Sequence, residues 1–175
     1  MSTTQIVCWV GAAALLFWIV GAYNRLVRLR GAIVRRFAPV DEHFRQRHAL
    51  VLLLLDALAP VLLNASPRLD ALRAASQQVA AACAHAKLRP GAVGGITSLR
   101  LADEILAEAR ARLPVQTASG IDLSDLNARL SASDAMLAFA RGQFNEAVSA
   151  YNHAIHQFPT VLLVGLFGFR SAGML

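Results

Sequence analysis

Cysteine is scarce in this sequence. Cys8 and Cys83 are the two cysteines, and they stand in unlike settings, one inside an apolar run and the other in an alanine-rich segment. Such a pair makes no disulfide framework and lacks the spacing of metal ligands. We therefore interpret both as small apolar residues that fill space between packed helices.

Aromatic residues (7%) and charged residues (16%) are also few, whereas 56% of the chain is hydrophobic, much of it alanine and leucine. Alternating runs of β-branched residues are missing, so no segment is convincing as a strand. This composition favours helices that pack closely on one another. We predict an all-α protein, with room for a membrane anchor and one domain of about 140 residues.

The motifs of common active sites are missing as well. The chain has no G-x-S-x-G, P-loop or G-x-G-x-x-G pattern, and the glycine-rich stretch at 91–95 lacks the lysine and flanking strand of a phosphate loop. Glu146, His153 and His156 lie close in sequence, but without the Glu-x-x-His pairs that supply metal ligands in helical bundles. We expect no enzyme activity, no cofactor and no bound metal.

The positive charge of the chain (+6) is concentrated between Arg25 and Arg47, where Asp41 and Glu42 are the acidic residues. A nucleic-acid-binding protein more often spreads its arginines over a folded face, so we expect no nucleic-acid partner. The arginines that closely follow the apolar run are instead expected at a membrane surface: Arg25, Arg28, Arg30, Arg35 and Arg36.

That apolar run, from Ile6 to Ala22, contains neither a charge nor a proline. As a helix it spans about 25 Å, and its flanks extend it towards the roughly 30 Å thickness of the hydrocarbon core. We predict a short outer N-terminus (1–4) and a transmembrane helix over residues 5–23. Because positive charge stays on the cytoplasmic side, we expect a single-pass inner-membrane protein whose remaining chain is cytoplasmic and meets the inner leaflet.

Two alternatives stay open. The apolar run also fits a cleaved signal peptide, with Val20-x-Ala22 as the cleavage site, although no basic region precedes it. The arginines either touch anionic headgroups, at about 1 kcal/mol per charge, or are a solvated topology signal.

Helical periodicity continues through an elongated antiparallel bundle predicted over residues 24–159. Pro39 is expected to end or kink its first helix, and the second, apolar on every side at its centre, is expected to be the most buried. Asp56 and Pro60 argue against a second membrane span there. The predicted helices cover residues 24–38, 40–64, 67–88, 96–113 and 123–158.

The last of these helices has a large residue at every seventh position, from Leu123 to Phe158, and mostly small residues three places later. That alternation is typical of a helix packed closely along its length. The apolar tail at 160–175 begins with ten residues that are too short to cross a bilayer. We expect it either to dock on the bundle or to lie at the membrane surface.

An aromatic-Asn-x-x-β-branched pattern occurs at 23–27, 144–148 and 151–155. Asparagine has no local advantage inside a helix, so these side chains are expected to fix the register of packed elements. Our hypothesis is that the first and last helices run antiparallel and bring Asn24 to Asn152 near the membrane; three unrelated solvated asparagines are the alternative. The candidate interaction residues are Tyr23, Asn24, Val27, Phe144, Asn145, Val148, Tyr151, Asn152, Ile155, Phe158 and Pro159.

Three blocks carry a family resemblance: YNRLVRLRGAIV (23–34), FRQRHALV (44–51) and RGQFNEAVSAYNHAIHQFPTVLLVGLFGF (141–169). In combination they resemble the LemA family of small, membrane-anchored bacterial proteins. Leu52, Phe144 and the LPVQTAS stretch (113–119) depart from the family's usual residues. The resemblance implies an N-terminal membrane helix and an elongated cytoplasmic helical bundle, with no established catalytic activity.

We therefore expect a membrane-tethered helical scaffold or protein-interaction module without catalysis of its own. Its expected partners are the membrane and an unidentified protein, a second copy of itself included. The alternatives are a regulatory or accessory subunit of a membrane enzyme such as a protease, and a secreted helical protein made with a signal peptide.

Overall fold

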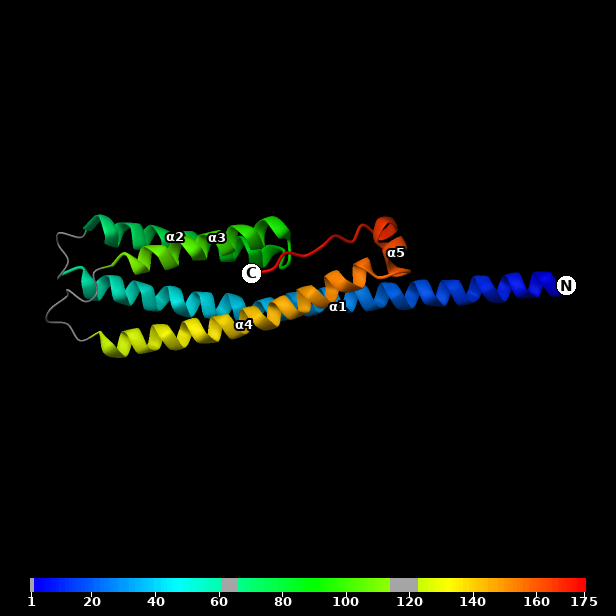
Figure 1. Cartoon of the computed structure of the whole chain (residues 1–175), viewed down its shortest axis with the longest axis horizontal. Coiled ribbons are helices and arrows are strands. Elements are labelled where there is room, and N and C mark those ends of the chain that lie inside the picture. Colours follow the sequence, from blue (N-terminus) through cyan, green and yellow to red (C-terminus); the bar gives the residue numbers. More distant parts are fainter. Residues whose placement is uncertain (1, 61–65, 114–122) are drawn as a thin grey trace.

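The computed structural model of the protein describes residues 2–60, 66–113 and 123–175. Over these residues it contains five α-helices and no strand, which confirms the predicted all-α fold (Figure 1). The helices are α1 (Thr3–Leu58), α2 (Ser66–Leu88), α3 (Val93–Ala111), α4 (Ser124–His156) and α5 (Thr160–Phe167).

The molecule is elongated because every long helix lies along the same direction (Figure 1). α1 runs from one end of the molecule to the other, and α4 returns antiparallel beside its second half. α2 and α3 form an antiparallel hairpin that packs on α1 through α2. The first turns of α1 project beyond the bundle, and the short α5 lies where the projection begins.

α1 continues without a break through Pro39, so the predicted division into helices 24–38 and 40–64 is wrong. A proline inside a helix costs about 3 kcal/mol, because one hydrogen bond is lost and its ring crowds the preceding turn. Its neighbours Phe37 and Val40 are buried, and burial of such side chains contributes roughly 1.5–3 kcal/mol each. Packing on both sides of Pro39 therefore offsets the cost. α1 then ends at Leu58, and residues 61–65 lie outside the described residues.

The centre of the predicted 40–64 helix, expected to be the most buried part of the bundle, is buried on some of its sides and exposed on another. Val51, Leu54 and Leu55 are in the core, but Leu52 and Leu53 are exposed. α2 and α4 cover two sides of α1 here and leave an outer face uncovered. In α2 the buried residues repeat at three- and four-residue steps along the helix: Leu69, Leu72, Ser76, Val79, Cys83 and Ala86.

The seam predicted along the last helix is largely confirmed, since Leu130, Leu137, Phe144 and Tyr151 are all buried. Phe158 is the exception, with 80% of its surface exposed. α4 ends at His156 instead of residue 158, because the residue before a proline is disfavoured in a helix. Phe158 therefore leaves the seam, and Pro159 directly precedes α5.

Candidate functional site

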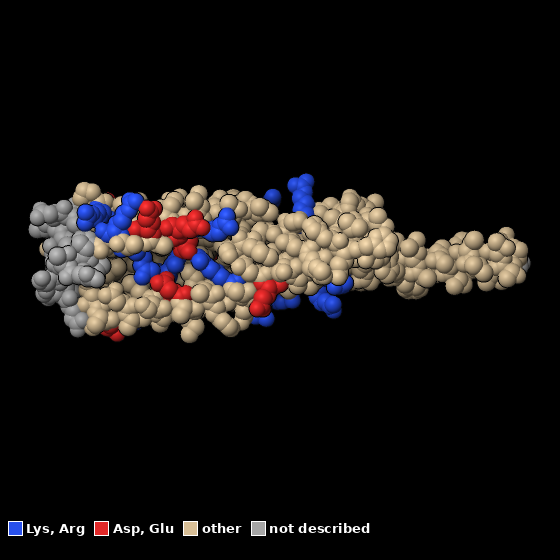
Figure 2. Space-filling view, in the orientation of Figure 1, with Lys and Arg blue, Asp and Glu red and all other residues tan. Residues whose placement is uncertain are grey.

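The projecting end of α1 is a candidate membrane span. Among the described helices, α1 is the one that is long and apolar enough to cross a membrane, and none of its most apolar window is buried. Trp9 and Phe17 are both at least 70% exposed, and the projection forms a bare rod without charged side chains (Figure 2). A segment with so many neighbouring exposed apolar side chains is unusual on a soluble monomer.

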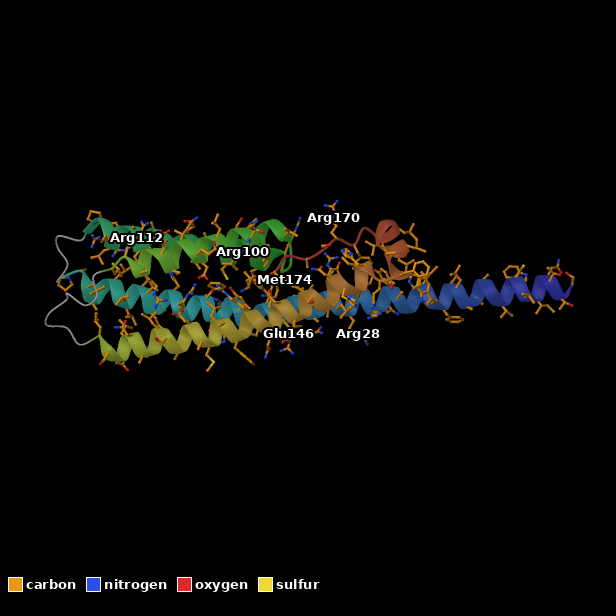
Figure 3. The ribbon with its side chains drawn as sticks, in the orientation of Figure 1. Arg28, Arg100, Arg112, Glu146, Arg170 and Met174 are labelled. Atoms are coloured by element: carbon orange, nitrogen blue, oxygen red, sulfur yellow. The ribbon has the colours of Figure 1, made fainter. Side chains whose placement is uncertain are left out.

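The candidate membrane-surface arginines, which are Arg25, Arg28, Arg30, Arg35 and Arg36, are all exposed on the turns of α1 that follow this span. Among the described residues none of the five forms an ion pair, and Arg36 donates a hydrogen bond to Gln143 of α4. Arg28 points away from the bundle (Figure 3). These guanidinium groups are free to meet anions outside the protein.

In α4 the aromatic and β-branched members of the repeated pattern belong to the core. Phe144 packs edge-on against Phe37 of α1, with ring centroids 5.7 Å apart. Val148, Tyr151 and Ile155 are buried on the same side of α4. This packing orients the helix so that the asparagines, one position after each aromatic, lie on its flank.

Those two asparagines bind an extended backbone. Asn145 donates to the carbonyl of Leu175 (2.8 Å) and accepts from its amide (2.9 Å). Asn152 makes the same pair of bonds with Ala172, at 2.9 and 2.8 Å. Seven residues of helix rise about 10.5 Å, and three residues of extended chain cover about 10 Å, so the two spacings match. We call these four residues the asparagine clasp.

The other side of segment 168–175 lies against the turn between α2 and α3. The amide of Gly173 donates to the carbonyl of Gly91 (2.9 Å). Gly91 has φ +94°, a conformation that favours glycine, and a Cβ on Gly173 would come within 3.0 Å of Val93 Cα. The segment thus fills a narrow space between α4 and the α2–α3 turn.

The first copy of the pattern has a different environment. Asn24 and Val27 are exposed, whereas the ring of Tyr23 lies 5.1 Å from that of Phe167 and 6.0 Å from that of Phe169. The expected pair of Asn24 with Asn152 is therefore replaced by the clasp. The extended segment 168–175 has backbone N–H and C=O groups that need partners, and the side-chain amide of Asn145 or Asn152 supplies both an acceptor and a donor. Pro159 is partly buried beside α5.

A buried charge cluster joins three helices and was not predicted. Arg47 of α1 and Arg141 of α4 both donate to Asp103 of α3, and Arg110 of α3 bonds Asp134 of α4 at 2.9 Å. Burial lowers the pKa of Arg47 to about 10, against the opposing effect of Asp134. The bundle is thus held together between α3 and α4 by charged side chains. On the surface of the bundle, Figure 2 shows acidic and basic side chains gathered together.

Asp103 is buried in this cluster, whereas its neighbours Glu104 and Glu108 pair with the exposed Arg100 and Arg112. A signal was present in the sequence. Arg47 falls three residues after Phe44 and four before Val51, on the stripe of α1 that faces the core. A charge on a buried stripe requires a partner.

A second polar cluster lines a pocket of about 290 Å³ between α1 and α2. Asp41 accepts hydrogen bonds from Arg45 (2.6 Å), Lys87 (2.8 Å) and the thiol of Cys83 (3.5 Å). Burial works against ionisation of this carboxyl group, but the bonds from Lys87, Arg45 and Cys83 lower its pKa overall. Burial raises the pKa of Cys83 to about 12, which makes its thiol unreactive.

The asparagine clasp and the two polar clusters bind parts of the protein to one another and hold its helices in position. In the described part of the chain, no three His, Cys, Asp or Glu side chains are placed to hold a metal ion. His153, considered above as a ligand, bonds Gln157 (2.9 Å) at the surface.

Comparison with known proteins agrees with this geometry. A model of the LemA family matches residues 105–175, which take in the end of α3, all of α4 and α5, and the clasp. No curated protein matches the chain, and no solved structure does. The match supports the resemblance to the LemA family: it includes the last of the three sequence blocks (141–169), whereas the blocks at 23–34 and 44–51 lie outside it.

Proposed function

We propose that this protein is a membrane-tethered helical scaffold without catalytic activity of its own. One observation carries the proposal: a single helix, α1, passes from a bare apolar segment directly into the core of the bundle. Phe17 is 76% exposed, whereas Leu26, nine residues later, is fully buried. An uncovered segment of this kind is stable in hydrocarbon, and the bundle then stands on it without a linker.

The continuity of α1 favours an uncleaved anchor over a signal peptide. Cleavage after Ala22 would cut α1 within its regular hydrogen bonding and separate the apolar segment from Tyr23, which packs on Phe167. The five exposed arginines support a cytoplasmic bundle, because positive charge is retained on that side of the membrane.

The scaffold role rests on the shape and surface of the bundle. A helix of 56 residues is about 84 Å long, so the bundle reaches well beyond the headgroups. α4 has Met136 and Phe139 exposed on its outer side. These two side chains are neighbours on the helix surface, three residues apart, and we expect a partner protein to pack on them.

Membrane extraction tests the anchor. We expect the full-length protein to stay in the membrane pellet after an alkaline carbonate wash and to enter solution in detergent. Leu15→Arg, at the centre of the bare segment, adds about 2.5–3.5 kcal/mol to insertion and is expected to shift the protein towards the soluble fraction. Recovery of wild-type protein in the carbonate supernatant would contradict the proposal.

Sidedness is tested by labelling with a membrane-impermeant maleimide in intact cells, in a Cys8→Ser background. Cysteine at Ser2 is expected to react, whereas cysteine at Phe139, which is exposed on α4, is expected to react only after the cells are opened. The opposite pattern would place the bundle outside the cytoplasm.

A further inference from the structure

The two longest stretches of the sequence without Lys, Arg, Asp or Glu are residues 1–24 and 147–169. The fold brings the two together, although most of the chain separates them. α5 contacts α1, and Tyr23 at the end of the bare segment packs on Phe167 and Phe169. On the face shown in Figure 2, the surface from α5 to the free end of α1 has no charged side chain.

α5 is only partly covered by the rest of the protein. Thr160 and Leu163 are buried, but Leu162 is 66% and Leu166 is 75% exposed. Other large apolar side chains are exposed beside them on or next to the same helix: Phe158, Val161 and Phe167. The uncovered side of α5 is therefore apolar throughout.

The direction of α5 differs from that of every other helix. It lies across the long axis of the molecule, at the level where the bare segment of α1 ends (Figure 1). If α1 crosses a bilayer, α5 lies nearly parallel to the membrane surface and at its edge. That is the position of an interfacial helix, which buries an apolar side at the boundary between headgroups and acyl chains.

The residues around α5 change from apolar to polar and cationic, as is expected at the boundary between acyl chains and headgroups. His153 and Arg170 are exposed on either side of α5 in the chain, and Arg170 points away from the bundle (Figure 3). Arg25 and Arg28 follow Tyr23 on α1. Polar and cationic groups thus begin where the apolar surface stops, as they would at a layer of anionic headgroups.

We propose that α5 is a second membrane contact, which inserts its exposed apolar side among the lipids beside the anchor. The inference rests on the proposed anchor and adds to it. The occupant of this surface is lipid and not a protein partner, because the surface is continuous with the bare segment of α1 and at its membrane boundary. Two points of attachment would also restrict the tilt of the bundle.

Spin labelling of the full-length protein tests this placement. Cysteines are replaced by Cys8→Ser and Cys83→Ala, and single nitroxides are attached at Leu162→Cys or Leu166→Cys in vesicles of phosphatidylcholine and phosphatidylglycerol. Phe139→Cys is the matched control, an exposed apolar residue of α4 far from α5. Val10→Cys reports on the anchor itself.

Collision rates with oxygen, which concentrates in lipid, and with a water-soluble nickel chelate give the result. We expect the labels at 162 and 166 to meet nickel about threefold or more less often than the label at 139, with oxygen collisions raised. A label at 166 as open to nickel as that at 139, with 10 shielded, would overturn the α5 proposal and leave the anchor. A label at 10 open to nickel would overturn the anchor itself. Labels at 162 and 166 shielded from both reagents would mean that protein covers α5, which also overturns the proposal.

Discussion

Arg47 of α1 and Arg141 of α4 lie on the same aromatic ring and bind the same carboxylate. Each guanidinium carbon is 5.1 Å from the centre of the Phe44 ring, and both side chains donate to Asp103 of α3. Two like charges are thereby brought close together inside the bundle. The carboxylate of Asp103 pairs with both, whereas Asp134 of α4 lies 3.5 Å from Arg47, so the position of α3 depends on Asp103.

Removing that carboxylate should weaken the whole bundle. Asp103→Asn leaves Arg47 with the longer contact to Asp134 (3.5 Å) and removes the ion pair of the partly buried Arg141. We expect the free energy of unfolding to fall by about 3 kcal/mol. Thermal unfolding followed by circular dichroism in detergent measures the change. Glu104→Gln is the matched control on the same helix, because its pair with Arg100 is exposed, and we expect less than about 1 kcal/mol. Equal effects of the two substitutions would contradict the role of the cluster.

The asparagine clasp predicts a local effect. Asn145→Leu and Asn152→Leu keep the side-chain volume but remove two hydrogen bonds each, at about 1–3 kcal/mol per site. We expect faster amide hydrogen exchange in segment 168–175, with little change along α2. Asn24→Leu serves as the control, and it also tests whether Asn24 pairs with Asn152. If it released the segment as strongly as Asn152→Leu does, Asn24 would be part of the clasp after all.

Substitution of Gly173 and of Gly165 by alanine is expected to change thermal stability in opposite directions. A methyl group at Gly173 meets the backbone of Val93 at 3.0 Å, so Gly173→Ala is expected to displace the segment and lower thermal stability. Gly165 lies inside α5 with open space around it, and Gly165→Ala is expected to stabilise that helix by about 0.5–1 kcal/mol. Unfolding midpoints that shift in the same direction for both variants would argue against the close contact at Gly173.

Asp41 gives the protein an acid-sensitive contribution to stability. Its pKa is lowered in the folded state because bonds from Lys87, Arg45 and Cys83 outweigh the effect of burial. A carboxyl group of this kind stabilises the fold above its unfolded pKa, 3.8, and the contribution is lost as pH falls through the folded value. Asp41→Asn should therefore cost about 1–2 kcal/mol at pH 7 and progressively less below pH 4, by unfolding at a series of pH values. Asp125→Asn, at an exposed pair, is expected to show no such convergence.

The helices and their buried sides could be predicted from the sequence, because burial of a helix leaves a three- and four-residue period in its apolar residues. The stripe of α2 and most of the α4 seam follow directly from that period. The break at Pro39 was wrongly predicted because a local preference was outweighed by packing of Phe37 and Val40.

Polar partners were harder to predict than apolar ones. The flank position of Asn145 and Asn152 marks them as unusual, but a single helix carries no information about which chain lies beside it. Their partner is an extended backbone, whose donors and acceptors are the same for every residue type except proline, so its sequence gives no signal. Asp103 was missed for a related reason, since its partners come from α1 and α4.

Because α1 is uninterrupted, it fixes the rotation of the bundle about the helix axis relative to the bare segment. Successive residues of a helix are separated by about 100° around its axis, so one residue inserted after Ala22 would turn the whole bundle by that angle relative to the bare segment. Met136 and Phe139 would then face another direction relative to the bare segment, whereas Tyr23 and Phe167, which both follow the insertion, would keep their contact. With the bare segment as the proposed anchor, the few residues between it and the first buried leucine determine which neighbours in the membrane the bundle can reach.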